Sequence, residues 1–375
     1  FEGMGRDNGP TPMLRDYHIS VAKGGVGMTT LAYAGINRSA LSFKTQLWLR
    51  QEIVAPLREI TDGIHEAGAK ASIQIGHCGN MTHRSTAGCI PVGASTGFNL
   101  YSPTFCRGLR KDELKQMAKD FGTAVNTARD AGFDCVEVHA GHGYLISQFL
   151  SPYTNRRRDE FGGSLENRMT FMKMCLEEVM KSAGSDMGVL VKTNMRDGFK
   201  GGLEIDDCLA VAREIERCGV HAMVLSGGFV SKAPMYVMRG RMPVYSMTHY
   251  MKQLWLKYGV RLAGKYMIPS VPFRELYFLD DARRFREALD LPLVYVGGVV
   301  SRANADEVLD REGFDFVQMG RALLNEPDFV NRMRNDDTHR CSCDHVNYCI
   351  ARMYSREMAC HKHCADLTPE IRKEI

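Results

Sequence analysis

The amino-acid sequence predicts an α/β protein that folds as an eight-stranded (β/α)8 TIM barrel with a short Cys-rich C-terminal extension. Short apolar runs alternate with segments of helical spacing, which is typical of a parallel sheet. The length of 375 residues, the glycine or polar residues after almost every predicted strand, and the lack of an early GxGxxG turn favour a closed barrel over an open doubly wound sheet. We expect the barrel to span residues 1–330 and the Cys-rich extension residues 331–375.

Seven segments are predicted strands because they are continuous apolar and β-branched runs, as in strands buried on both faces. They are VGMTTLAY (26–33), KASIQIG (70–76), DCVEVHA (134–140), GVLVKTN (188–194), HAMVLSGG (221–228), LPLVYVGG (291–298) and FDFVQMG (314–320). Segments between them, such as 114–132 and 205–219, repeat apolar residues at helical spacing and end at glycine, as helices do. The eighth strand is expected at the start, where FEGMG resembles the end of a strand, and we expect further residues before Phe1.

Two predicted loops are longer than usual, at residues 77–108 and from 229 to about 290. Each comes after a predicted strand, and the loops after the strands build the active face of a parallel barrel. They are expected either to form walls of a substrate site or to be additions without a catalytic role.

Composition excludes several classes of function. The 48 basic and 44 acidic residues are interspersed and give a net charge of +4, without the basic stripe that nucleic-acid binding needs. No apolar run reaches the roughly 18 to 20 residues of a membrane span, and the N-terminus lacks signal-peptide features. Seven of the twelve cysteines are scattered singly, which favours a reducing compartment. We expect a cytoplasmic protein that acts on a small molecule, with no nucleic-acid or membrane partner; the sequence leaves a homo-oligomer open.

Three titratable rings lie at the end of the predicted strand 134–140 and just after it. In a parallel barrel, His139, His142 and Tyr144 would open onto the common catalytic mouth, and the adjacent glycines let the backbone turn tightly. Imidazoles donate hydrogen bonds to an oxygen, and a phenol can deliver a proton to carbon. Such a cluster suits the polarisation of a carbonyl group and the protonation of its neighbour.

The stretch VEVHAGHGYLISQFLSP, with NRRRDEFGGSLENRMTF shortly after it, resembles the signature block of the Old Yellow Enzyme family of flavin-dependent ene-reductases. The resemblance continues through SIQIGHCGN, VKTN, AMVLSGG, VYVGGV and VQMGRALLNEPD, in the order of the family, and covers about residues 3 to 330. It implies a TIM barrel with FMN at its mouth and NAD(P)H as the reductant.

The resemblance also implies roles for single residues. His139 and His142 match the pair that hydrogen-bonds the electron-withdrawing group of the substrate, and Tyr144 matches the residue that protonates the α-carbon after hydride transfer from flavin N5. Gln74 matches the glutamine on the flavin pyrimidine edge. Lys192 stands where many members place an arginine near flavin N1, a position where a cation stabilises negative charge on the reduced ring.

The remaining flavin contacts are expected at the last two strands and at the first. Gly297 and Gly298, with Gly320 and Arg321, fit the phosphate site of such barrels, where backbone N–H groups and a guanidinium meet the dianion. Further positions are Met4 and Gly5, where the first strand of the family lays its backbone along the flavin, and Ser226 and Gly228, which are expected to line the site less directly.

The Cys-rich extension resembles a metal-binding segment that is incomplete. Relatives of the dienoyl-CoA reductase and trimethylamine dehydrogenase branch hold a [4Fe–4S] cluster there on four thiolates. Cys343, Cys349 and Cys360 match three ligands, but Val346 stands at the place of the second. The segment is expected to be a remnant, or to hold an altered cluster or zinc with help from Cys341, Cys364, His345, His361 or His363.

We therefore expect an FMN-dependent ene-reductase that reduces activated C=C bonds with electrons from NAD(P)H. One alternative is oxidative amine chemistry that passes electrons to a tail cluster, which Val346 disfavours. Another is a non-catalytic flavin or metal binder, which would leave His139, His142 and Tyr144 without a function.

Overall fold

The core of the protein is a curved, parallel, seven-stranded sheet. The computed structural model describes residues 2–251, 253–353, 355–365 and 367–375, and within them the strand order is β1-β2-β6-β7-β8-β9-β10, all parallel. All seven strands predicted from the sequence are confirmed. The strands of this sheet are β1 (Met28–Gly35), β2 (Lys70–Gly76), β6 (Cys135–His139), β7 (Gly188–Asn194), β8 (Ala222–Ser226), β9 (Leu293–Val296) and β10 (Phe316–Gln318).

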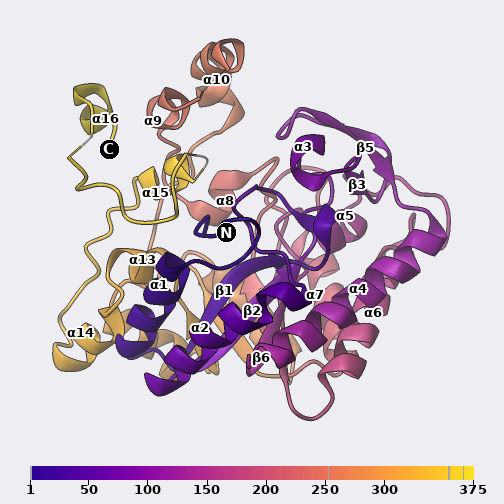
Figure 1. The fold of residues 1–375 in the computed structure, drawn as a ribbon, viewed down its shortest axis with the longest axis horizontal. Helices are drawn as coiled ribbons and strands as arrows, with labels where there is room; N and C mark the ends of the chain where they lie inside the picture. The colour runs from indigo at the N-terminus through magenta and orange to yellow at the C-terminus, as the bar shows by residue number, and fades with distance from the viewer. Residues whose placement is uncertain (1, 252, 354, 366) are drawn as a thin grey trace.

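Helices cover the outer face of this sheet (Figure 1). Their apolar stripes join the outward side chains of the strands in one large core. The helices up to the last strand are α1 (Pro12–Lys23), α2 (Val54–Glu66), α3 (Arg84–Ala87), α4 (Lys111–Asp130), α5 (Leu145–Leu150), α6 (Leu165–Ala183), α7 (Ile205–Arg217), α8 (Pro234–Met238), α9 (Val244–His249), α10 (Leu254–Met267), α11 (Leu279–Ala288) and α12 (Arg302–Asp306). Short 3₁₀ or π turns lie at Arg38–Ala40, Gln51–Ile53 and Glu307–Arg311.

The inner face of the sheet changes from apolar to polar toward the carboxyl ends of the strands. Because side chains alternate between faces, Glu137 and His139 of β6 both point inward. A small apolar cluster that includes Leu190, Val224 and Val294 closes one end of the inner face. The strands therefore present their polar inward side chains on the side of the mouth.

The eighth strand expected at the start of the chain is not formed in the described residues, and Phe1 lies outside them. Residues 2–5 are irregular: Gly5 N–H donates to Thr45 O at 3.1 Å, and the Glu2 carboxylate accepts from Ala32 N–H at 3.1 Å. Residues 2–5 are therefore held by loop and side-chain contacts instead of by strand pairing. The described sheet is an open, partial barrel.

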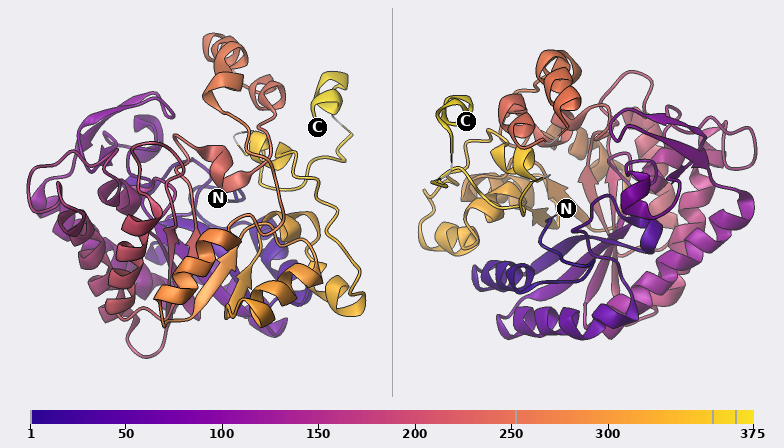
Figure 2. Two further views of the ribbon diagram at one scale, coloured as in Figure 1. Left: turned by 180° about the vertical axis from the view of Figure 1, so that it is seen from behind. Right: turned by 45° about the horizontal axis from the view of Figure 1, so that its top comes forward.

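The two long predicted loops contain regular structure. Residues 77–108 hold α3 and a small sheet of β3 (Val92–Gly93), β4 (Gly97–Asn99) and β5 (Thr104–Gly108), and the second region holds α8 to α11. Figure 2 shows α9 and α10 standing away from the sheet. Both regions lie on the carboxyl side of strands, as expected from the sequence.

The C-terminal segment packs on the insertion between β8 and β9. It comprises α13 (Arg321–Asn325), α14 (Phe329–Asn335), α15 (Tyr348–Arg352) and α16 (Pro369–Glu374). Helix α14 crosses the boundary predicted at residue 330. Tyr348, Ala351 and Ile371 form a small core of their own with Tyr250 of the insertion, so the Cys-rich extension is held by the insertion as well as by the barrel.

Candidate active site

Strand β6 and the turn at its carboxyl end bring His139, His142 and Tyr144 together. The ring centroids of His139 and His142 are 5.1 Å apart, and those of His139 and Tyr144 are 4.5 Å apart. The turn is tight because His142 and Gly143 adopt left-handed φ angles of 58° and 82°. The three rings that the sequence singled out therefore form one cluster, although their catalytic roles stay predictions.

The surroundings keep all three rings uncharged. Burial lowers the pKa of both imidazoles, and the Lys192 ammonium adds to this effect. Burial also raises the pKa of the Tyr144 phenol. Near neutral pH the cluster thus offers two neutral imidazoles, each with one N–H donor, and a phenol that retains its proton.

Residues from β7 and β8 hold His142 in place. Its Nε2 shares a hydrogen bond with Ser226 Oγ at 2.7 Å, and its backbone N–H donates to Asn194 Oδ1 at 3.0 Å. Asn194 in turn donates to Gly228 O at 2.8 Å. Ser226 and Gly228 were expected to line the site less directly. Asn194 was not predicted from the sequence, although its side-chain amide connects the turn after β6 to the end of β8.

Tyr33 is a fourth ring of the cluster, and sequence reasoning missed it. It is buried at the end of β1, with centroids 5.2 Å from Tyr144 and 6.2 Å from His139. Gly76 makes this approach possible, because a Cβ there would lie 3.1 Å from His139 Cβ. The only signal was a tyrosine at the end of an apolar strand.

A buried polar group lies below the rings on the inner face of the sheet. Glu137 is 1% exposed, and its carboxylate accepts from Lys192 Nζ at 2.9 Å, Gln74 Nε2 at 2.5 Å and Gln318 Nε2 at 3.1 Å. The two predicted flavin contacts, Gln74 and Lys192, are therefore neighbours. Glu137 and Gln318 were missed, although each is a polar residue inside an apolar strand.

The predicted phosphate segments also meet. Strands β9 and β10 pair in register, which puts Gly297 and Gly298 beside Gly320 and Arg321. Gly297 and Gly298 have φ angles of 135° and 76°, and a Cβ on Gly297 would lie 2.9 Å from the Phe278 ring. There is no room for a side chain at Gly297 or Gly298. Backbone atoms therefore line the predicted phosphate site at these two positions.

Charged groups near this glycine pair are suited to an anion. The Arg239 guanidinium stacks on the rings of Tyr277 and Phe278, at 4.8 and 5.2 Å, and its Nε is buried without a partner among the described residues. Arg321 Nη1 donates to Asn347 Oδ1 at 2.9 Å. An orphaned guanidinium nitrogen beside a glycine cradle fits the phosphate of FMN.

Near the start of the chain, Met4 is buried and Gly5 lies against the loop at Thr45. A Cβ on Gly5 would be 2.4 Å from Thr45 O. The same small hollow is lined by Tyr33 and Gln46, and Gln46 Nε2 is buried without a partner among the described residues. This orphaned amide, like the orphaned nitrogen of Arg239, fits a polar ligand at the mouth.

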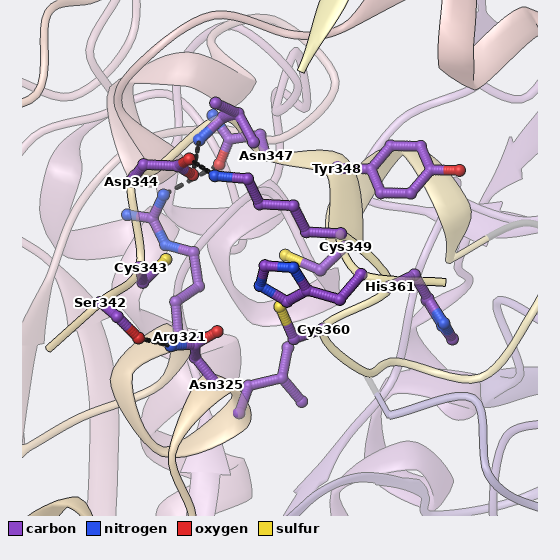
Figure 3. Close-up of a pocket in the computed structure, with 14 residues that line it drawn as sticks. Arg321, Asn325, Ser342, Cys343, Asp344, Asn347, Tyr348, Cys349, Cys360 and His361 are labelled. Carbon is purple, nitrogen blue, oxygen red and sulfur yellow. Dashed lines mark hydrogen bonds and ion pairs between the residues drawn. The ribbon is translucent and has the colours of Figure 1, made fainter. Parts of the chain in front are cut away.

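The Cys-rich extension lines a cavity of about 40 Å³, which Arg321 of the predicted phosphate site also lines (Figure 3). Cys343, Cys349 and Cys360 line it together with Val346, and burial raises the pKa of the Cys349 thiol to about 11. Over the described ranges, no set of three or more Cys, His, Asp or Glu side chains is arranged to hold a metal ion. The three predicted thiols therefore line one cavity, and among the described residues they are not arranged as a metal-binding group.

The proposed substitute ligands are scattered. His361 and His363 line the cavity, whereas His345 is stacked on Phe273 with centroids 3.5 Å apart. Cys341 packs in a different small core, and Cys364 Sγ is 3.7 Å from His361 Nδ1. The structure does not bring all the candidate ligands to one point.

Comparison with known proteins agrees with the resemblance. The model of the NADH:flavin oxidoreductase / NADH oxidase family matches residues 2–339. A 4,4'-dithiodibutanoate disulfide reductase of Rhodococcus erythropolis is 36% identical over 356 residues, which cover 95% of this chain and 88% of that protein. No helix among the described residues is long and apolar enough to cross a membrane.

Solved structures share the fold. A 2-naphthoyl-CoA reductase complex matches with a TM-score of 0.81 and 20% identity over all of this chain, which spans 54% of that protein's length. An Old Yellow Enzyme homologue from Zymomonas mobilis matches with a TM-score of 0.71 and 21% identity, over 92% of this chain and 88% of that one. These likenesses confirm the predicted α/β barrel fold.

Proposed function

The chain belongs to the NADH:flavin oxidoreductase / NADH oxidase family, and we propose that it reduces activated C=C bonds, such as those of α,β-unsaturated carbonyl compounds. The electrons come from NADH or NADPH, and the proposed cofactor is FMN. The observation that best supports this reaction is the contact of the neutral His139 ring with the rings of both His142 and Tyr144.

The residues that would hold FMN are those that match the family and fit its chemistry. Gln74 and Lys192 would meet the pyrimidine edge, and the backbone of Gly297, Gly298 and Gly320, with the Arg321 guanidinium, would meet the phosphate. Bound there, FMN would supply the hydride-transfer chemistry that links the nicotinamide to the alkene.

The imidazoles bind and polarise the substrate. Each neutral ring donates one N–H to the carbonyl oxygen, where negative charge develops as the β-carbon receives hydride. When the Ser226 hydroxyl donates to His142 Nε2, the proton of His142 is on Nδ1, which is then the nitrogen available to the substrate.

Tyr144 supplies the proton that completes the reaction. Its burial keeps the phenol protonated near neutral pH, as a general acid must be. Tyr33 and His139 pack against its ring and limit its motion, so the hydroxyl can be directed at the α-carbon.

Anaerobic stopped-flow kinetics of Tyr144→Phe test this assignment. Reduction of the flavin by NADH should stay within about twofold of wild type, whereas reoxidation by 2-cyclohexen-1-one should slow by about 10²- to 10⁴-fold. Tyr33→Phe is the matched control, because it removes a hydroxyl from the neighbouring ring and should change neither step substantially. Wild-type reoxidation of Tyr144→Phe would show that Tyr144 is not the proton donor.

A second acceptor class is favoured by the relative that carries the name 4,4'-dithiodibutanoate disulfide reductase. In such a reaction of this chain, NADH and one proton would reduce the S–S bond to two thiols, and Tyr144 would protonate a departing sulfur. Anaerobic turnover with 4,4'-dithiodibutanoate, with thiol titration of the products, should yield two thiols per NADH consumed. NADH consumption without thiol release would exclude this acceptor.

We also propose that the tail works without an iron–sulfur cluster, because Val346 stands in the place of a thiolate ligand. This disfavours an amine dehydrogenase that exports electrons through the tail. Iron and sulfide analysis of protein purified without oxygen should find far less than one cluster per chain, and Val346→Cys should raise the iron content. Stoichiometric iron and sulfide in the wild type would contradict the proposal.

A further inference from the structure

Helix α10 lies at the outer edge of the molecule (Figures 1 and 2), and its side chains form an exposed apolar stripe. Three of its side chains are aromatic and two are leucines. They are Leu254, Trp255, Tyr258, Leu262 and Tyr266, with exposed fractions of 64%, 71%, 61%, 83% and 84%. At 3.6 residues per turn they fall within about 120° of the helix circumference, so they form one continuous face.

This face is too large for ordinary surface scatter. An aromatic side chain can bury roughly 150–250 Å², so three of them with two leucines offer several hundred Å² of apolar surface. Exposed apolar patches of that size on soluble proteins mark a site of interaction. We therefore expect another molecule or surface to cover this apolar stripe.

The charge of the surrounding chain identifies the kind of occupant. Residues 229–274 contain eight Lys and Arg residues and no Asp or Glu, and of these Arg239 belongs to the proposed phosphate site and Arg274 pairs with Asp280 at 2.7 Å. The two described basic side chains of α10 are directed toward α9: Lys257 Nζ donates to His249 O at 3.1 Å, and Arg261 Nε donates to Thr248 Oγ1 at 2.9 Å. Their described contacts are neutral groups, so their positive charge is not compensated there.

We propose that α10 docks the protein on the surface of an anionic phospholipid bilayer. Trp, Tyr and Leu on one face of a basic helix are the side chains that lie in the interface between headgroups and acyl chains. Anionic headgroups attract the cations of this segment, such as Lys257 and Arg261, whose described contacts are neutral groups. A second copy of the chain is a poorer occupant, because pairing two such segments would bring like charges together.

This inference departs from the expectation that the protein has no membrane partner. That expectation rested on the lack of a spanning segment, whereas a helix that lies on a bilayer needs only an apolar face. The proposal does not depend on the reaction catalysed at the mouth.

Vesicle flotation tests the proposal directly. The full chain should float with vesicles of equimolar phosphatidylcholine and phosphatidylglycerol, far less with phosphatidylcholine alone, and less again as salt is added. Leu262→Asp puts a charge in the centre of the stripe and should lower the bound fraction by about tenfold or more. The matched control is Met13→Asp on α1, another exposed apolar residue at 50%, which should bind as wild type does.

Fluorescence supplies a second readout from the helix itself. The chain has two tryptophans, so a Trp48→Phe variant leaves Trp255 as the only reporter. Its emission should shift to shorter wavelength on anionic vesicles and stay unchanged on neutral ones. NADH oxidation with a soluble acceptor should be equal in wild type and Leu262→Asp, which separates docking from catalysis.

Three results would overturn the proposal. They are a failure to float with anionic vesicles, equal flotation of wild type and Leu262→Asp, and a concentration-dependent dimer in the absence of lipid that Leu262→Asp dissociates. The last result would assign the stripe to a second copy of the chain.

Discussion

The turn after β6 and the Cys-rich tail both carry residues that were predicted to be functional, but among the described residues the two regions arrange them differently. His139, His142 and Tyr144 lie close together in the sequence, and their rings are in contact. Cys343, Cys349 and Cys360 line one cavity without a metal-binding arrangement among the described residues. Strand β6 is hydrogen-bonded to a strand on each side, which fixes the position of the turn at its end. The Cys-rich tail is mostly irregular, so the positions of its side chains depend on packing against distant segments and on any bound ligand.

The largest expected effect is the loss of folding stability when the buried charge beside the turn is removed. Glu137→Ala would leave the Lys192 ammonium buried without its carboxylate, and breaking a buried pair in this way costs about 3–5 kcal/mol. Urea unfolding of flavin-free protein measures this loss without a contribution from cofactor binding. A loss below about 1 kcal/mol would mean that the buried group does not stabilise the sheet.

The next effect is on catalysis. His142→Ala removes one proposed hydrogen-bond donor to the substrate oxygen, and alkene reduction should fall by about 10²- to 10³-fold. The tail offers a comparison in His345→Ala, since His345 stacks on Phe273 and is not a proposed donor to the substrate. Equal rates for His142→Ala and wild type would remove His142 from the mechanism.

The pH dependence of stability should report on the buried histidines. Burial lowers the pKa of His77 to about 3, and the pKa of His139 is also low, so both stay neutral in the folded state. The unfolded chain binds protons on both below about pH 6.5. The free energy of unfolding should therefore decrease as the pH is lowered from about 6.5 to about 4.5. The decrease should be up to about 1.4 kcal/mol per pH unit for each histidine.

The histidine effect can be isolated by mutation. The carboxylate of Glu326, whose pKa is about 2 because Ser342 and His339 bond to it, loses its stabilising effect only below about pH 4.5. His77→Asn should therefore flatten the slope between about pH 6.5 and 4.5. An unchanged slope would show that His77 is already neutral in the unfolded chain or charged in the fold.

The smallest expected effect is at the contact between the tail and the insertion. Glu374 accepts hydrogen bonds from Tyr245 N at 2.9 Å and Ser246 N at 2.7 Å at the start of α9. Glu374→Ala removes this cap and should lower stability by about 1 kcal/mol. A loss as large as that of Glu137→Ala would show that the tail is part of the main cooperative unit.

Much of the fold and part of the site could be predicted from the sequence. Continuous apolar runs predicted all seven strands, and the density of rings after β6 predicted the cluster. Glu137 and Gln318 were missed because their partners come from other strands, and register is set by the whole sheet. Tyr33 was missed for the same reason.

Regions without a strong periodicity were less predictable. The segment from residue 229 to about 290 was expected to be a loop but contains α8 to α11, because α9 is stabilised by packing against the tail and α10. The substitute metal ligands His345 and Cys341 were candidates by proximity in the sequence. In the structure His345 stacks on Phe273, and Cys341 packs against a separate small core.

The absorbance spectrum of the purified protein during a two-step anaerobic titration tests most directly whether the protein is an FMN-dependent alkene reductase. We expect flavin bands from one FMN per chain, bleaching on addition of NADH or NADPH, and return of the bands when an activated alkene is added. A protein that binds no flavin when reconstituted with FMN, or whose flavin is not reduced by either nicotinamide, would contradict this assignment.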